Sequence, residues 1–169
     1  MENTNREHVL SIRDLSITFK TGAGPVNAIR GVNIDLYKGE TLAVVGESGS
    51  GKSVTFKAAM GILASNSIVN SGSITYTYHH NDGTPATVDL LKMKTKDIRR
   101  HINGKRIAMI FQDPMACLNP RKKVGEIIAQ GLDIHHLYKN RAERQQKVAD
   151  ILRKVGLAPE HADRYPHQF

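Results

Sequence analysis

Gly46-Glu47-Ser48-Gly49-Ser50-Gly51-Lys52-Ser53 is the most informative stretch in this chain of 169 residues. It fits the pattern G-x-x-x-x-G-K-[ST], the loop that wraps the phosphates of a nucleotide between a strand and a helix. Residues 40–45 before it form a short apolar run with the β-branched content of a buried strand. Behind it, apolar residues recur at the spacing of one helix face, at Phe56, Ala59, Met60 and Leu63. The pattern therefore predicts strand, phosphate loop and helix, with a plain Gly/Ser-rich turn as the alternative.

Each residue type in this loop has a chemical reason. Glycines turn backbone N–H groups inward and let phosphate oxygens approach closely. The following helix adds unpaired N–H groups and the positive end of its dipole. Lys52 is expected to reach the β- and γ-phosphates, and the Ser53 hydroxyl is expected to coordinate Mg²⁺. The sequence predicts a nucleoside triphosphate site.

Composition excludes several other classes. With 40% hydrophobic and 24% charged residues the chain is ordinary for a globular protein, and it contains no apolar run long enough to span a membrane. One cysteine excludes an internal disulfide, and the eight histidines show no metal-ligand spacing. Residues 91–169 carry 17 basic against 8 acidic residues, a net charge of +9. The basic residues of this half lie in short clusters without aromatic residues between them. A solvated basic face is therefore favoured over nucleic-acid binding.

The remaining elements follow from periodicity and turn chemistry. Residues 9–19 and 28–36 are predicted strands, and the turn between them suggests a hairpin. Further predictions are strands at 73–78 and 107–111, a short basic helix at 94–102, and two later amphipathic helices. Asn140, with Glu143 three residues on, marks the start of the last helix, and Gly156 marks its stop. The order indicates an α/β domain with a helical segment.

Three further stretches carry a family resemblance. They are Phe111-Gln112-Asp113-Pro114-Met115, then Leu118-Asn119-Pro120, and the closing Tyr165-Pro166-His167-Gln168-Phe169. Together with the phosphate loop, they resemble ATP-binding subunits of ABC transporters, in the oligopeptide, dipeptide and nickel importer group. The resemblance covers nearly the whole chain, from Val9 onward.

The resemblance implies a fold and a division of the chain. The implied fold is an α/β P-loop NTPase core of the ABC ATPase type, with an antiparallel β subdomain and a helical subdomain. Residues 1–118 would form the nucleotide-binding core with the β subdomain, and residues 119–169 the helical subdomain. Residues 1–169 would be a partial ABC ATP-binding domain.

The resemblance also implies cofactors and site residues. ATP and Mg²⁺ would be bound, with Lys52 and Gln112 as catalytic residues, and with Ser53 and Gln112 at the metal. The residues expected to contact ATP are Phe19, whose ring would stack on adenine, and Gly46, Glu47, Ser48, Gly49, Ser50, Gly51, Lys52, Ser53 and Val54.

The chain departs from the family pattern at its end. In the family, the Tyr-Pro-His-Gln segment runs into a Ser-Gly-Gly signature motif, then a strand ending in Asp-Glu and a switch histidine. The chain stops at Phe169, before these elements. We therefore expect the C-terminal part of the core to be missing, and residues 1–169 alone not to hydrolyse ATP.

The favoured function is the ATP-hydrolysing subunit of a peptide importer at the cytoplasmic face of the membrane. The resemblance implies transmembrane permease subunits and a second ATP-binding subunit as partners, with an extracytoplasmic substrate-binding protein acting indirectly and no nucleic acid. The alternatives are a small self-contained P-loop kinase, with Asp113 as its acidic residue, and a nucleotide-binding fragment without hydrolysis.

Overall fold

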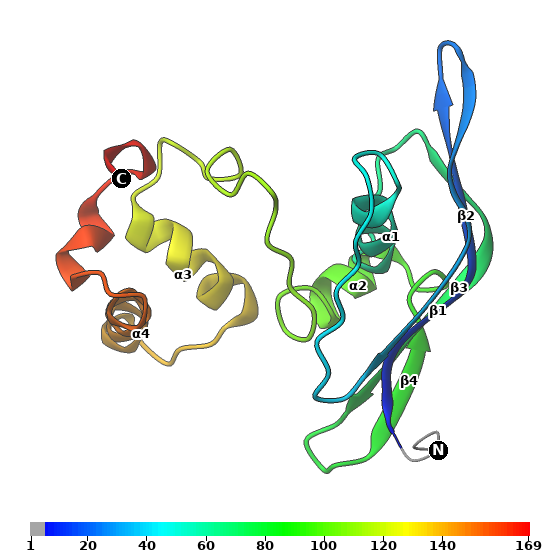
Figure 1. The fold of residues 1–169 in the computed structure, drawn as a ribbon. Coiled ribbons are helices and arrows are strands. Elements are labelled where there is room, and N and C mark those ends of the chain that lie inside the picture. Colours follow the sequence, from blue (N-terminus) through cyan, green and yellow to red (C-terminus); the bar gives the residue numbers. More distant parts are fainter. Residues whose placement is uncertain (1–5) are drawn as a thin grey trace. The chain divides into compact units, whose positions relative to one another are not determined.

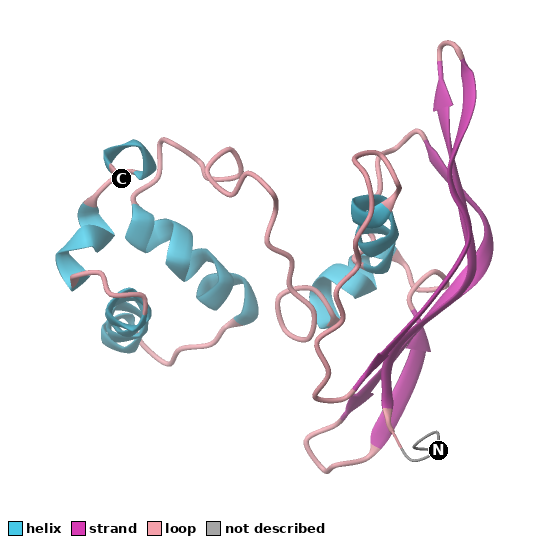
Figure 2. Ribbon diagram, in the orientation of Figure 1, coloured by secondary structure: helices cyan, strands magenta, loops and turns pink. Residues whose placement is uncertain are grey.

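A computed structural model describes residues 6–169 of the chain (Figures 1 and 2). The chain divides into two compact units, Met1–Arg106 and Ile107–Phe169. In the described part, no helix combines the length and the apolar character needed to cross a membrane. The predicted division at residues 118 and 119 is a functional one and stays a prediction.

The first unit is built on an antiparallel sheet with the strand order β2-β1-β3-β4. Its strands are β1 (His8–Thr21), β2 (Gly24–Tyr37), β3 (Ser67–His79) and β4 (Pro85–Asp89). The predicted hairpin is confirmed, because β1 pairs with β2 from Thr21 opposite Gly24 through Phe19 opposite Val26. The predicted strand at 73–78 is confirmed as part of β3. The sequence reading missed β4, a five-residue edge strand that begins with a proline.

Two helices lie on one side of this sheet, α1 (Lys52–Ala59) and α2 (Thr95–His101) (Figure 1). Both were predicted, although α1 ends at Ala59 and so excludes Leu63 from the helix. The helices meet where Gly61, just after α1, contacts the side chain of Ile98 in α2. The buried core of the unit consists of residues from β1–β3, both helices and the segments that follow them: Leu10, Ile12, Leu15, Ile17, Ile29, Ala58, Ala59, Met60, Ile74, Tyr76, Leu90, Ile98 and Ile102.

The two predicted strands at 40–45 and 107–111 are wrong, because neither segment is a strand in this structure. Figure 2 draws the chain between β2 and α1 as a loop. Val45 is 89% exposed and Ile110 is 91% exposed. A strand buried on both faces needs hydrogen-bonded neighbours on its edges, and no strand of residues 6–169 pairs with either run. Both runs have the apolar composition of buried strands, but the described elements include no strand that pairs with them.

The second unit contains α3 (Val124–His135) and α4 (Arg141–Lys154), followed by two short 3-10 helices, η1 (Pro159–Asp163) and η2 (Pro166–Gln168). Its core joins Ala129 of α3 to Val148 and Leu152 of α4. The partly buried apolar residues packed around this core are Val124, Ile128, Leu132, Leu157 and Ala162. Both predicted amphipathic helices are therefore confirmed.

Helix α4 begins and ends where its sequence signals predict. The Asn140 side chain accepts a hydrogen bond from the backbone N–H of Glu143 at 2.9 Å, and the Glu143 carboxylate accepts from the Lys139 N–H. After the helix, Gly156 takes a left-handed conformation with φ of 78°. These local signals need no tertiary contact, which explains why they could be read from the sequence.

The N-terminus of α3 is held tightly against η1. A methyl group added at Gly125 would lie 3.0 Å from both the Cβ and the carbonyl oxygen of Ala162. The backbone N–H of Val124 donates to the carbonyl of Arg164 at 2.8 Å. A side chain at this position would therefore have to push Ala162 away by a few tenths of an ångström.

An ion pair joins the C-terminal end of α3 to the first turn of α4. The Arg144 guanidinium donates two hydrogen bonds to the Asp133 carboxylate, at 2.6 and 2.7 Å. Together with a hydrogen bond from Tyr138, this contact lowers the pKa of Asp133 from 3.8 to about 2. The pair links the two helices beside the loop that connects them.

The lowered pKa of Asp133 predicts an acid-sensitive second unit. The stabilising contribution of a carboxylate with a depressed pKa is complete above its unfolded pKa and is lost as the pH falls through its folded pKa. We expect the helicity of α3 and α4, followed by circular dichroism, to weaken as the pH falls from 3.8 towards 2. Asp133→Asn should flatten this dependence, whereas Glu160→Gln, a change on exposed η1, should retain it. An identical acid response in wild type and Asp133→Asn would contradict the role of the pair.

The exposed apolar runs predict self-association of the 169-residue chain. Extended, exposed apolar segments with free backbone groups are ready to pair with another chain. Sedimentation velocity should detect dimers or larger species, and Val45→Lys combined with Ile110→Lys should shift the population towards monomer. Val155→Lys, at a 66% exposed position on the end of α4, is the control and should leave association unchanged. A wild-type chain that stays monomeric over the accessible concentration range would contradict this prediction.

Candidate phosphate-binding site

The predicted phosphate loop leads directly into α1, as the motif requires. Gly49 and Gly51 have φ of 83° and 90°, left-handed values that bend the loop, and Ser50 N–H donates to the Glu47 carbonyl at 3.2 Å. No side chain among residues 6–169 caps the start of α1. The first backbone N–H groups of the helix thus have no acceptor inside it and point outward at its positive end. This is the arrangement that binds an anion.

Lys52 lies at the first position of α1 and folds back over the loop. Its ammonium donates hydrogen bonds to the carbonyls of Gly46 and Glu47, at 2.6 and 2.8 Å, and to the Ser50 hydroxyl at 3.1 Å. These three acceptors match the three N–H donors of a lysine. The loop therefore curls around the ammonium and concentrates positive charge at the N-terminus of the helix.

The last glycine of the loop is pressed against β2. A Cβ built on Gly51 would lie 2.4 Å from Ile29 Cδ1 and 2.9 Å from the Ala28 carbonyl oxygen. The buried Thr55 hydroxyl donates to the Gly51 carbonyl at 3.1 Å, and the Thr55 N–H donates to the same oxygen at 3.0 Å. The start of the helix is thus fixed between β2 and its own first turn.

The other residues of this unit that are predicted to contact ATP are exposed or partly exposed. Ser53 is exposed and Val54 is half-buried in the first turn of α1, while Glu47 and Ser48 are exposed in the loop. Phe19 lies near the end of β1, opposite Val26 in β2 and Ser67 in β3, and its ring is partly exposed. The structure therefore leaves the Ser53 hydroxyl and part of the Phe19 ring free to contact a ligand.

Gln112 belongs to the second unit, in an exposed segment before α3. The carboxylate of the next residue, Asp113, accepts a hydrogen bond from the backbone N–H of Ala116 at 3.1 Å, and the Asp113 carbonyl accepts from the thiol of Cys117. Asp113 thus closes the turn that contains Pro114. Among residues 6–169 there is no cluster of three or more side chains suited to a metal.

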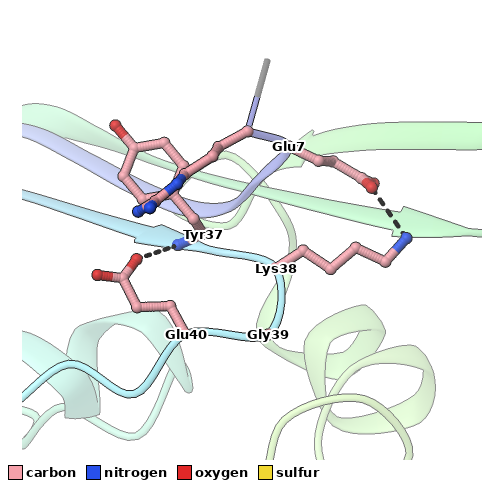
Figure 3. Close-up of a pocket in the computed structure, with 6 residues that line it drawn as sticks. Glu7, Tyr37, Lys38, Gly39 and Glu40 are labelled. Carbon is pink, nitrogen blue, oxygen red and sulfur yellow. Dashed lines mark hydrogen bonds and ion pairs between the residues drawn. The ribbon is translucent and has the colours of Figure 1, made fainter. Parts of the chain in front are cut away.

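An open pocket of about 600 Å³ lies at the turn that leads from β2 towards the phosphate loop (Figure 3). Lys38 donates to Glu7 at 3.0 Å, and the backbone N–H of Tyr37 donates to Glu40 at 3.1 Å. The guanidinium of Arg6 lies over the ring of Tyr37, 6.0 Å from its centre. Because these charges are already paired, the pocket supports the turn and is not a second candidate for the phosphates.

The sequence reading missed the residues that support the loop from below. Ile29, Ala28 and Thr55 hold Gly51 in place, but only Thr55 has a sequence signal, since it lies four residues after Gly51 on the helix. Ile29 and Ala28 are far from the loop in sequence and come to it only through the fold.

With the loop, its lysine and the supporting sheet described, comparison with known proteins identifies the class. The family model described as "ABC transporter" matches residues 29–169. The match covers well over half of the chain, so this chain belongs to the ABC transporter family.

The most similar curated relatives include two peptide-transport proteins. The oligopeptide transport ATP-binding protein OppF of Bacillus subtilis (strain 168) is 42% identical over 163 residues, which cover 96% of this chain and 49% of the relative. The dipeptide transport ATP-binding protein DppD of Lactococcus lactis subsp. cremoris is 40% identical over 165 residues, covering 96% and 44%. This chain thus spans about half the length of the curated relatives it matches.

Solved structures agree on the fold. A dimeric bacterial ABC transporter cassette superposes with a TM-score of 0.73 at 20% identity, over 95% of this chain and 62% of that one. An ATP-binding cassette in a post-hydrolysis dimer with ADP and Pi gives 0.71 at 20% identity with the same coverage. The expected α/β fold of the ABC ATPase type is confirmed.

The packing of Gly51 against β2 can be tested with a matched pair of alanine substitutions. Gly49→Ala meets no atom within 4 Å, so only its left-handed φ of 83° opposes the change, at about 1–2 kcal/mol of unfolding free energy. Gly51→Ala has the same kind of φ and also the contacts with Ile29 and Ala28, so we expect about 1–3 kcal/mol more. Urea unfolding of both variants measures the difference. Equal losses would show that the contact with β2 contributes nothing.

Proposed function

We propose that this chain is the nucleotide-binding part of a subunit that powers import of oligopeptides or dipeptides by ATP hydrolysis. The observation that carries the proposal is the Lys52 ammonium held by three loop acceptors at the uncapped start of α1. Several similar curated relatives are oligopeptide and dipeptide transport ATP-binding proteins, which supports peptides as the transported class.

In this proposal, the Lys52 ammonium exchanges its acceptors in the loop for phosphate oxygens when a nucleotide binds. The Gly46 and Glu47 carbonyls and the Ser50 hydroxyl bind the Lys52 ammonium in the structure. Phosphate oxygens carry more negative charge than these neutral acceptors, so the ammonium gains by turning to the β- and γ-phosphates. The N–H groups at the start of α1 would bind the same phosphates, without having to break hydrogen bonds within the helix.

The metal would be bound by Ser53 and Gln112, and the adenine base by Phe19. Ser53 directly follows Lys52, and its exposed hydroxyl is of the right chemistry for Mg²⁺, a hard cation that takes oxygen ligands. Gln112 would supply a second oxygen ligand and report the γ-phosphate to the helical unit. Mg²⁺ would supply charge neutralisation of the transferring phosphoryl group. The partly exposed Phe19 ring would stack on adenine.

The partners follow from the same proposal. The subunit would work as a pair with a second ATP-binding subunit, beneath transmembrane permease subunits at the cytoplasmic face of the membrane. An extracytoplasmic substrate-binding protein would deliver the peptide. The dimeric form of the two similar solved cassettes supports pairing as the working state.

The experiment that tests the proposal is calorimetric titration of the 169-residue chain with MgATP. Lys52→Ala removes the charge facing the phosphates, so we expect ATP affinity to fall by about 10- to 100-fold, the effect of a charge-assisted hydrogen bond. Lys57→Ala is the control, because Lys57 is a second lysine on the same helix, away from the loop. ATP binding unchanged by Lys52→Ala would contradict the assignment of the loop, and so would equal losses in both variants.

A further inference from the structure

Helix α2 and the residues that flank it carry a cluster of exposed positive charge. The α2 basic surface, as we define it, comprises five exposed cations, Lys94, Lys96, Arg99, Arg100 and Lys105. Nothing in the nucleotide-binding proposal uses them. They lie on the helix and on the residues that flank it directly.

The helix separates its charges from its apolar residues cleanly. Ile98 and Ile102 are 3% and 1% exposed and face the core of the first unit. Lys96, Arg99 and Arg100 follow the spacing i, i+3, i+4 and therefore share the opposite, solvent-facing side. The fold thus presents three cations together on one turn of helix.

These cations form no ion pair in the described structure, although Asp97 lies in the first turn of the same helix. Among residues 6–169, no ion pair involves any member of the α2 basic surface, and the nearby Lys92 pairs with Asp89 instead. Like charges at i, i+4, such as Lys96 and Arg100, destabilise a helix. Lys94 and Lys96 also lie at the N-terminal end of the helix, where its dipole disfavours cations. Arg99 and Arg100 lie in the last turn, where the dipole favours cations, so the destabilising positions are those of Lys94 and Lys96.

Helix α4 shows that this chain neutralises helical cations elsewhere. Of its basic residues, Arg144 pairs with Asp133, Lys147 with Glu143, and Arg153 with Asp150. The contrast is between two helices of one protein with similar densities of basic residues. Arg141 and Lys154 of α4 form no ion pair, so what sets α2 apart among residues 6–169 is that none of its lysines and arginines is paired and that they share one face.

We propose that the α2 basic surface binds an anionic lipid surface through its headgroup phosphates. Exposed lysines and arginines on one helix face can contact a plane of headgroups together, without a pocket. The partly exposed Leu91 and Met93 directly precede the cluster, and apolar side chains beside basic ones favour a lipid interface.

A nucleic acid fits the same surface less well. Single strands are bound by aromatic rings on which bases stack. The ring of Tyr78 is already covered by the guanidinium of Arg106, which lies 3.7 Å from its centre. Tyr76, next to it on the same strand face, is buried. The surface offers charge without stacking groups, and this inference goes beyond the proposed function because it does not involve the nucleotide.

Vesicle co-sedimentation of the 169-residue chain tests the proposal. Wild type should bind vesicles containing phosphatidylglycerol at low salt, should not bind pure phosphatidylcholine vesicles, and should dissociate as salt screens the charges. The test variant replaces four members of the surface with glutamine: Lys94→Gln, Lys96→Gln, Arg99→Gln and Arg100→Gln. At about a factor of five per cation, it should weaken binding by about 100-fold or more.

A matched variant removes the same charge from the second unit. It carries four exposed changes of the same types: Arg121→Gln, Lys122→Gln, Arg141→Gln and Lys154→Gln. We expect it to bind vesicles within a few-fold of wild type, with circular dichroism confirming that both variants are folded. Equal losses in the two variants would overturn the proposal by showing that net charge alone binds lipid, and so would tighter binding to duplex DNA or to polyglutamate than to the vesicles. Calorimetric ATP affinity, measured on the same samples, keeps this result separate from the nucleotide site.

Discussion

The contact between Gly51 and β2 is the constraint on which the candidate site depends. Because the last loop glycine lies against Ile29 and the Ala28 carbonyl, α1 can begin at only one place relative to the sheet. That position sets the direction of the uncapped helix start and the reach of Lys52. The antiparallel sheet therefore buries a core and also provides the surface against which the phosphate loop packs.

The lysine contacts show how a loop can be organised without its ligand. Three neutral oxygens hold the Lys52 ammonium, which keeps the loop curved and the helix start accessible. Each of these neutral acceptors can be replaced by a more negatively charged phosphate oxygen when an anion binds. The sequence pattern predicts which residues are involved, but the identity of the acceptors that hold the lysine comes only from the structure.

Local signals were read from the sequence correctly and long-range ones were not. The Asn140 cap, the Gly156 stop and the hairpin turn depend on neighbours a few residues away, and each was predicted. The runs at 40–45 and 107–111 have the composition of buried strands, but a strand forms only when another strand pairs with it. For the site, the motif predicted the loop and the lysine, whereas its support by Ile29 and Thr55 depends on packing and has little or no signature in the sequence.

The close contact between Gly125 and Ala162 has a mechanical consequence for the second unit. The close approach of Gly125 to Ala162 and the hydrogen bond from the Val124 N–H to the Arg164 carbonyl hold the two elements together. A displacement of η1 would therefore be transmitted to the start of α3. We therefore expect the start of α3 and η1 to move together, as closely packed elements do.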